Sequence, residues 1–394
     1  MFEFSYFTPT RVVFGKDAEC RAGEMAREAG ARHALLVYGG GHALASGLVE
    51  RVRASLRGAG ISFAELGGVK PNPLIEKAYE ALRLAETQKP DLIIAIGGGS
   101  VIDTAKAIGY ALAEPERDAW ELFAHARKAK ACLPIAAIPT IAAAGSEMSD
   151  SCVMTNGKTS EKRGYSSDLC RPRFALLNPE LTYGVPPWHT ACGNADILMH
   201  TMERYFTNGG NLELTDSIAE GLMRTVMHNA LIVRDDPRNG KARAELMWAS
   251  CLSHNGLTGC GNGGNDFASH MLEHELSGFF DVTHGAGLTA VWGSWARYVY
   301  KNCLPRFEKF ALSVMGVLPG GNAEETALRG IAAMEEFFRS LGLPTDIRGL
   351  GIELADEQIA QMARSAALGS GGGKGSAKFL AEKDIAAIYA MARG

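Results

Sequence analysis

The amino-acid pattern of this 394-residue chain changes near residue 186, and this change restricts the folds that are open to it. Up to about residue 180, short apolar runs of strand-forming residues alternate with amphipathic helical stretches. Alternation of this kind predicts a parallel sheet with helices on its faces. Beyond Pro186 the strand patterns stop, and long helical patterns follow one another towards the C-terminus. We therefore expect an α/β domain with a parallel sheet, followed by an all-helical domain.

The expected elements can be given by residue number. Strands are expected at HALLVY (33–38), ISFAEL (61–66), DLIIAI (91–96), LPIAAIPT (133–140) and RFALLN (173–178). Helices are expected near 44–57 and 74–88, and then over 190–207, 212–232, 241–258, 264–279, 286–300, 322–341 and 383–392. The segment NPELTYGVPP (178–187) places three prolines and a glycine at the change of pattern, so it marks the boundary. The expected domains are residues 1–185 and 186–394, with a functional site between them.

The composition is that of an ordinary globular protein, and the charge distribution leads us to expect a small-molecule partner. Of the residues, 46% are hydrophobic and 21% are charged, and the formal net charge is −4. The basic residues are dispersed, so we expect no nucleic-acid partner and no binding to an acidic membrane surface. No apolar run reaches the ~18 residues of a membrane helix, and the first residues lack the pattern of an export signal. Eight cysteines without a CxxC pair favour reduced thiols and a cytoplasmic location.

A glycine cluster in AIGGGSVIDTAKAI (95–108) follows one expected strand and opens a helix near Ser100. Glycines let a diphosphate approach the backbone, and the free N–H groups and dipole of the helix favour its charge. The cluster is not GxGxxG, and a glycine turn that serves chain geometry alone is the alternative. Asp103 lies in the first turn and is either a helix-start charge or a ribose contact.

Two further loops are suited to a nucleotide. VYGGGH (37–42) follows the first strong strand, where an acidic residue often binds the ribose hydroxyls. Gly39, Gly40 and Gly41 carry no carboxylate, which favours NADP(H) over NAD(H). IPTIAAAGSEMS (138–149) offers small residues and hydroxyl groups, including that of Thr140, that suit close contact with a cofactor. A tight connection that needs small residues explains this loop equally well.

Four residues have types and spacings that suit one divalent metal ion. Asp196 and His200 are four apart in an expected helix, so both side chains project from one face. His270 begins a second helical stretch, and His284 follows among glycines that allow the chain to fold back. One carboxylate and three imidazoles suit Fe(II) or Zn. Ordinary hydrogen bonding of separate histidines is the alternative.

Taken in order, these segments resemble the iron-containing (group III) alcohol dehydrogenase family, close to its NADPH-dependent butanol dehydrogenase and aldehyde reductase branch. The resemblance runs almost from end to end. It is carried by PTRVVFG (9–15), VYGGG, VKPNP (69–73), AIGGGSVID, NPELTYGVPP, GNADILMHTME, HMLEHELSGFFDVTHGAG and DIAAIYAMAR. It implies an N-terminal nucleotide-binding α/β domain and a helical metal-binding domain, an architecture similar to that of dehydroquinate synthase.

The resemblance also implies roles for individual residues. It implies metal ligation by Asp196, His200, His270 and His284. The cofactor contacts that it implies, with the glycines of the first loop included, are Gly39, Gly40, Gly41, Asn72, Gly98, Gly99, Ser100, Asp103, Thr140 and Lys162. Typical members read PTTAGTGSE where this chain has PTIAAAGSE, so Ile141 and Ala144 replace hydroxyl groups expected beside the nicotinamide.

The chemistry that follows is reversible NADP(H)-linked interconversion of primary alcohols and aldehydes. A metal cation stabilises an alkoxide and polarises an aldehyde oxygen, while the nicotinamide gives or takes the hydride. His274 lies one turn after His270, and we expect it to relay a proton or else to orient a ligand. The segment FEFSYF (2–7) is strand-like and could pair with another subunit, so a homodimer is expected.

Three other functions compete with this one. His270, Glu273 and His274 spell HxxEH, a metalloprotease motif in which both histidines bind zinc. An NAD- and metal-dependent cyclase or lyase similar to dehydroquinate synthase would share the architecture, but we see no basic cluster for a phosphorylated acid. A protein that binds nucleotide and metal without turnover is the third.

Overall fold

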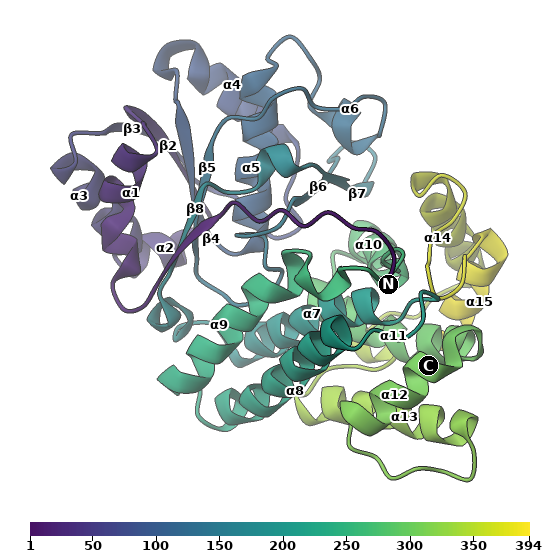
Figure 1. The fold of residues 1–394 in the computed structure, drawn as a ribbon. Coiled ribbons are helices and arrows are strands. Elements are labelled where there is room, and N and C mark those ends of the chain that lie inside the picture. The colour runs from purple at the N-terminus through teal and green to yellow at the C-terminus, as the bar shows by residue number, and fades with distance from the viewer. The chain divides into compact units, whose positions relative to one another are not determined.

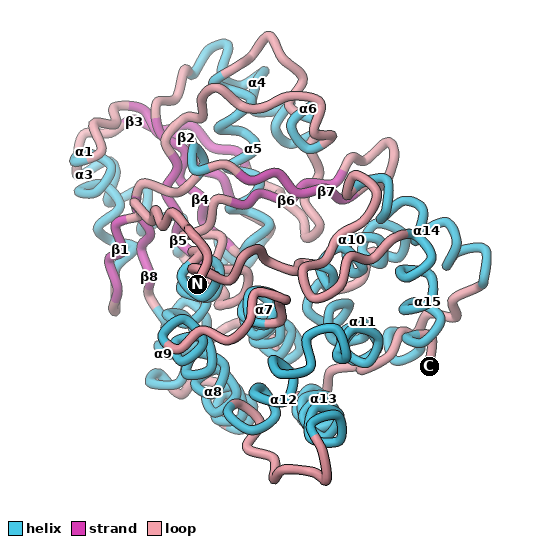
Figure 2. The backbone as a smooth tube through the Cα atoms, turned by 45° about the vertical axis from the view of Figure 1, so that its right-hand side comes forward, coloured by secondary structure: helices cyan, strands magenta, loops and turns pink.

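A computed structural model describes residues 1–394 apart from the side chain of His42. The chain forms two compact units, which Figures 1 and 2 trace. One unit is Phe7–Val185, and the other is Pro186–Gly394 together with Met1–Tyr6. The division at Val185 falls at the end of the first expected domain. The first six residues, which were expected in the α/β domain, instead belong to the helical unit.

The first unit is built on a six-stranded sheet in the order β1-β8-β5-β4-β2-β3, and every neighbouring pair is parallel. Its strands are β1 (Arg11–Phe14), β2 (His33–Tyr38), β3 (Ser62–Leu66), β4 (Leu92–Gly97), β5 (Ile135–Pro139) and β8 (Phe174–Leu177). A separate antiparallel pair joins β6 (Ser151–Thr155) to β7 (Lys162–Ser166). The expected parallel α/β fold is therefore confirmed.

Helices cover both faces of this sheet, which explains why its central strands are apolar throughout. They are α1 (Ala22–Glu28), α2 (Gly41–Ala45), α3 (Leu48–Gly58), α4 (Glu76–Gln88), α5 (Gly99–Ala113) and α6 (Trp120–Phe123). In β4, Ile93 and Ala95 pack into one core with α4 and α5, while Ile94 and Ile96 pack into another with α1 and α3.

The second unit is helical, as expected. Its helices are α7 (Pro187–Tyr205), α8 (Leu214–Asp235), α9 (Gly240–His254), α10 (Ala268–Phe280), α11 (His284–Val299), α12 (Leu304–Ser313), α13 (Ala323–Ser340), α14 (Asp356–Gly369) and α15 (Glu382–Ala392). Figure 2 shows the strands, in magenta, confined to the other unit. Stacked aromatic rings hold the helical core together, and the ring centroids of Phe206 and Phe307 are 4.1 Å apart. None of the described helices is long and apolar enough to span a membrane.

The N-terminal segment expected as an edge strand forms no strand within this chain. It runs along the helical unit, where the backbone N–H of Phe2 donates to the carbonyl oxygen of Gly261 over 3.0 Å. The side chains of Phe2 and Phe4 remain more than half exposed. The segment therefore still offers apolar side chains that a second copy of the chain could cover.

Candidate functional site

Helix α7 carries the first two predicted ligands, Asp196 and His200, one turn apart on a buried face. The His200 Nδ1 lies 2.9 Å from the backbone oxygen of Asp196 and 3.1 Å from its carboxylate Oδ1. The i, i+4 spacing predicted from the sequence thus places both groups beside each other.

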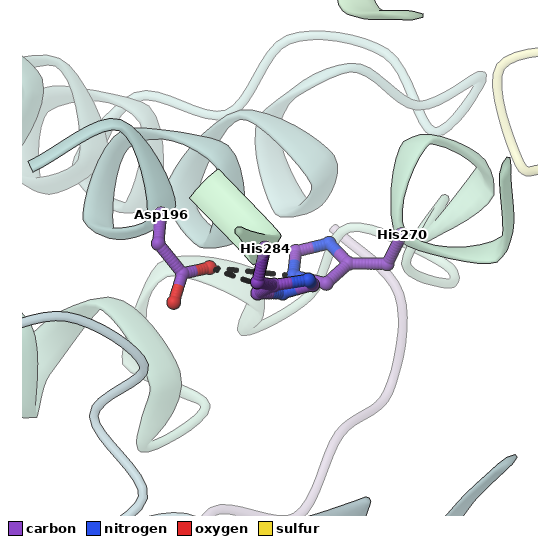
Figure 3. A group of neighbouring side chains, drawn as sticks. All are labelled: Asp196, His270 and His284. Carbon is purple, nitrogen blue, oxygen red and sulfur yellow. Dashed lines mark ion pairs between the residues drawn. The ribbon is translucent and has the colours of Figure 1, made fainter. Parts of the chain in front are cut away.

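The other two predicted ligands come from the ends of different helices. His270 lies in the first turn of α10, and His284 is the first residue of α11. The Asp196 Oδ1 is 3.5 Å from the His270 Nε2 and 3.7 Å from the His284 Nε2. One donor atom from each of the three residues lies within 4.8 Å of the others, and Figure 3 shows the three side chains converging.

His200 borders this group without joining it. Its ring centroid is 4.4 Å from that of His270, but the described group of mutually close donor atoms contains only Asp196, His270 and His284. The ring of His254 lies against the ring of His200 with centroids 3.9 Å apart. The structure therefore brings three of the four predicted ligands together and places the fourth next to them.

The donor set fits a divalent cation. The Asp196 Oδ1 and the His270 Nε2 are buried and have no hydrogen-bond partner within the protein, because the nearby His200 Nδ1 makes its hydrogen bond to the backbone oxygen of Asp196. A buried polar atom without a partner costs roughly 1–3 kcal/mol, so two that face each other need an explanation. A cation between them supplies it, because one carboxylate oxygen and imidazole nitrogens are ligands for Fe(II) or Zn.

Charges around the group control its protonation in the absence of a metal. Burial alone raises the pKa of Asp196, but the surrounding histidines outweigh it and hold that pKa well below its usual range. Burial lowers the pKa of His270, yet the charges of Glu203 and Asp196 and the hydrogen bond to Glu203 raise it to about 9. The group thus binds a positive charge even without a metal, in the form of a proton on His270.

The sequence reasoning missed one glutamate behind the histidines, Glu203, and considered the other, Glu273, only as part of the rival metalloprotease motif. Glu203, fully buried on α7, accepts a hydrogen bond from the Nδ1 of His270. Glu273, fully buried on α10, accepts one from the Nδ1 of His284. Glu203 follows Asp196 by seven residues, two helical turns, and that spacing was the available signal.

His274 is half-buried near these ligands but stands apart from their donor atoms. Its ring centroid is 6.3 Å from that of His270 and 6.0 Å from that of His284. The zinc pair required by the metalloprotease motif, His270 with His274, is not among the described convergent donors, and Glu273 bonds to His284 instead. The role of His274 stays a prediction.

The glycines beside His284 do not form the turn that was expected of them. Gly285 and Gly287 lie within α11 and let it pack closely, whereas the turn before the helix is made by Asp281, with a φ of 51°. A Cβ on Gly285 would lie 2.1 Å from the backbone oxygen of Cys192, and one on Gly287 would lie 2.9 Å from the Cγ of Glu273. Close approach of helices, rather than turn formation, explains these two residues.

In the sheet unit, the predicted phosphate turn joins β4 to α5. Gly98 caps α5, and Gly99 and Ser100 form its first turn. A Cβ on Gly98 would lie 3.0 Å from Ile141, and one on Gly99 would lie 3.3 Å from Ala144. Two of the residues that depart from the family pattern, Ile141 and Ala144, therefore pack on this turn.

Other predicted cofactor residues lie at the same edge of the sheet. Gly39 follows β2 and Thr140 follows β5, and both strands pair with β4 in parallel, so their carboxyl ends meet. Gly40 comes next, and Gly41 begins α2. Lys162 and Asn72 are brought together although ninety residues separate them, because the Lys162 Nζ donates to the Asn72 Oδ1 over 3.0 Å.

Asp103 is engaged in holding a loop. Its Oδ1 accepts from the Ser146 hydroxyl over 2.6 Å, and its Oδ2 accepts from the backbone N–H of Val153 over 3.0 Å. The fully buried Lys106, which the sequence reasoning did not single out, donates to the same Ser146 hydroxyl and to the backbone oxygens of Ser149 and Ser151. These contacts fix the loop that follows Thr140, and the ribose contact predicted for Asp103 remains untested.

Comparisons with known proteins agree with this arrangement. Residues 9–179 match the family model described as iron-containing alcohol dehydrogenase, and residues 190–393 match its C-terminal model. The NADH-dependent butanol dehydrogenase A of Clostridium acetobutylicum is 37% identical, over 99% of both chains. The NADPH-dependent aldehyde reductase YqhD of Escherichia coli is 33% identical, over 90% of both.

Comparison with solved structures leads to the same family. The crystal structure of an NADH-dependent butanol dehydrogenase A from Thermotoga maritima superposes with a TM-score of 0.95 at 35% identity, and covers 100% of this chain and 99% of that one. The matches decide against the metalloprotease and the cyclase or lyase. The chain belongs to the iron-containing alcohol dehydrogenase family, whose members use a divalent metal and a nicotinamide cofactor.

Proposed function

We propose that this chain interconverts primary alcohols and aldehydes with NADP(H), using Fe(II) or Zn bound by Asp196, His200, His270 and His284. The observation that carries the proposal is the pair of buried, unpartnered atoms, the Asp196 Oδ1 and the His270 Nε2. His200 is the fourth ligand of this proposal, since its ring centroid lies 4.4 Å from that of His270. The names of the relatives support alcohols and aldehydes as substrates.

In this proposal the metal and the protein groups have different roles. The bound cation supplies Lewis-acid chemistry that stabilises a developing alkoxide. The glycine turn before α5 holds the diphosphate of the cofactor at the helix N-terminus. His274, half-buried beside the ligands, exchanges the hydroxyl proton with solvent.

The choice of NADP(H) rests on Gly39. No carboxylate follows β2, so the ribose 2′-phosphate meets no negative side chain from Gly39, Gly40 or Gly41. The relatives differ on this point, because the butanol dehydrogenase is named for NADH and YqhD for NADPH. NAD(H) is therefore the alternative that direct measurement must separate.

Metal analysis of the purified protein, combined with NADPH oxidation against aldehydes of increasing chain length, tests the proposal. We expect about one Fe or Zn per chain and turnover that is lost on chelation and restored by adding metal. The His270→Ala variant should lose metal and turnover together, while His189→Ala, which changes an exposed histidine of α7, should keep both. Full activity of a metal-free protein would reject the proposal.

We also propose a homodimer in the cytoplasm. The exposed aromatic side chains of residues 2–7 support the dimer, and eight free cysteines support a reducing compartment. Light scattering of the full chain should give twice the monomer mass. Replacing Phe2 and Phe4 by Ser should shift the equilibrium towards the monomer, and a wild-type monomer at micromolar concentration would contradict the dimer.

A further inference from the structure

Two fully buried carboxylates stand directly behind two of the predicted metal ligands. Glu203 on α7 reaches His270 on α10, and Glu273 on α10 reaches His284 on α11. Each carboxylate therefore ties the helix that carries it to the next helix of the site. In both pairs the carboxylate meets the Nδ1, while the Nε2 faces Asp196 (Figure 3).

The contact with Nδ1 fixes which nitrogen of each ring carries the proton. A carboxylate only accepts hydrogen bonds, so the facing Nδ1 must be the N–H. In the neutral ring the Nε2 then keeps its lone pair, and this is the atom that lies 3.5 Å (His270) or 3.7 Å (His284) from the Asp196 Oδ1. A metal ligand needs this tautomer and this ring orientation.

The two glutamates differ in what their second oxygen does. The Oε1 of Glu203 accepts from the backbone N–H of His270 over 3.0 Å. That N–H lies in the first turn of α10, where backbone donors have no acceptor within the helix. The Oε1 of Glu273 instead accepts from the hydroxyl of Ser277, which also lies 3.3 Å from the backbone oxygen of Val282.

We propose that Glu203 and Glu273 are positioning residues that hold His270 and His284 in the metal-binding tautomer, and that Glu203 has the larger effect. The proposal rests on the metal site of the proposed function. Its physical basis is the difference between the second partners, a backbone N–H that can only donate and a hydroxyl that can donate or accept.

This difference predicts unequal effects of the same substitution. In Glu203→Gln, the one amide oxygen must serve the backbone N–H of His270, because that group has no other acceptor. The amide NH₂ then faces the Nδ1, which becomes an acceptor, and the proton moves to the Nε2. The nitrogen that should bind the metal is thereby blocked.

In Glu273→Gln, the neighbouring hydroxyl of Ser277 can change the direction of its hydrogen bonds. The hydroxyl of Ser277 can accept from the amide NH₂ and donate to the carbonyl of Val282. The amide oxygen then still accepts from the Nδ1 of His284, so the tautomer is kept and only the charge is lost. This variant keeps the Nδ1 of His284 and the hydroxyl of Ser277 paired, and it should fold.

The test measures metal affinity on the full chain after metal removal, by competition between Zn²⁺ or Co²⁺ and a chelator of known affinity. We expect Glu273→Gln to weaken binding about tenfold and Glu203→Gln about a hundredfold or more, at or beyond the top of the usual range for such partners. Glu335→Gln, which removes a mostly buried carboxylate paired with Arg297 in the same unit, is the matched control and should change affinity less than threefold.

A second readout follows the tautomers directly. Nitrogen NMR of the metal-free protein above pH 9, where the His270 ring is neutral, should show its proton on the Nδ1 in the wild type and on the Nε2 in Glu203→Gln. His284 should keep its proton on the Nδ1 in Glu273→Gln. A structural role alone would leave these signals unchanged in folded variants.

The possible failures are separable. A wild-type protein that binds neither ion contradicts the proposed function itself. A wild type that binds, with Glu273→Gln and Glu203→Gln both within threefold of it, overturns the positioning role. Equal losses in the two variants, with unchanged tautomers, overturn the larger effect of Glu203. If Glu203→Gln does not fold, Glu273→Gln and its NMR signals still decide whether positioning occurs.

Discussion

His270 shows most clearly how single residues set the properties of the site. It faces Asp196 with one ring nitrogen and Glu203 with the other, so two carboxylates surround one imidazole. A ring in this position holds either a metal ion or a proton. Without a metal its pKa is raised, and this has a consequence for stability.

The metal-free protein should lose stability as the pH rises from 6.5 to 9. Burial lowers the pKa of His270, but Glu203 and Asp196 raise it from 6.5 to about 9, so the folded state holds the proton more tightly than the unfolded chain does. The contribution is complete below pH 6.5 and is lost as the pH passes 9. It amounts to on the order of 3 kcal/mol.

Urea unfolding of the chelator-treated protein at several pH values measures this change. The His270→Gln variant, which cannot take up the proton, should show a flatter profile over the same range. Saturation with Zn²⁺ should also remove the dependence, because the metal replaces the proton. A metal-free wild type with constant stability from pH 6.5 to 9 would show that His270 does not hold the proton.

Gly39 is the second residue whose effect on the site, here on cofactor preference, can be tested by a single substitution. It lacks a positive φ, and a Cβ built on it would meet nothing closer than 3.5 Å, so Gly39→Asp should fold. An aspartate there would repel the 2′-phosphate and accept from the ribose hydroxyls. We expect kcat/KM to fall about 10- to 100-fold for NADPH and to rise or hold for NADH, because one unpaired charge contact is worth roughly 1–3 kcal/mol. Parallel steady-state assays with both cofactors decide, and unchanged preference would place the 2′-phosphate elsewhere.

At the scale of elements, the sequence predicted best where one pattern was strong and local. Strand β2 occupies the predicted residues 33–38, because strands buried on both faces have uninterrupted apolar runs. Helix α12 (304–313) and helix α14 (356–369) were missed, as were β1, β6 and β7. Strands β6 and β7 are stabilised by their contacts with each other and with α5. Their short sequences mix polar and apolar residues without a regular alternation, so neither strand was predicted.

Pairings between distant residues were the hardest to predict. The ligand pair on α7 followed from helical spacing alone. The contacts of Glu203 with His270 and of Lys106 with the loop after Thr140 depend on how separate elements pack. The only local signal for Glu203 is its spacing of seven residues from Asp196, and nothing in the local sequence distinguishes Lys106 from an ordinary surface position of a helix.

Lys106 allows a prediction about an element, the loop between β5 and β6. Its ammonium group donates to the backbone oxygens of Ser149 and Ser151 inside the unit. Lys106→Met keeps the length of the side chain but removes the ammonium donor from both oxygens. Among the residues described, only the Ser149 hydroxyl, 3.4 Å from the oxygen of Ser151, then remains as a donor to either of them. We expect a loss of about 2–4 kcal/mol in the free energy of unfolding.

Chemical unfolding, together with NADPH binding, measures the effect of Lys106→Met. Binding should weaken, because the loop after Thr140 lies against the glycine turn. The control is Lys158→Met, which changes an exposed lysine between β6 and β7 and should have wild-type stability. A Lys106→Met protein as stable as the control would mean that water or a rearranged loop replaces the ammonium group.

At the scale of the whole molecule, the candidate ligands and the candidate nucleotide contacts belong to different units. All four predicted metal ligands lie in Pro186–Gly394, and all ten predicted cofactor residues lie in Phe7–Val185. A ligand that binds only the folded state stabilises the elements that it contacts. Metal and cofactor should therefore protect different parts of the chain.

Hydrogen exchange followed by peptide mapping can test this division. Removal of the metal should speed exchange at least tenfold in α7, in α10 and in the first turn of α11, because His270 and His284 then lose the ion that joins their helices. The amides of β2, β4 and β5 should not change. Adding NADPH to the metal-free protein should slow exchange in the turns after Tyr38, after Gly97 and after Pro139, with little effect on α10. Protection of both units by the metal alone would show that the ion orders the nucleotide-binding unit as well, and the two units would then have to be treated as one cooperative structure.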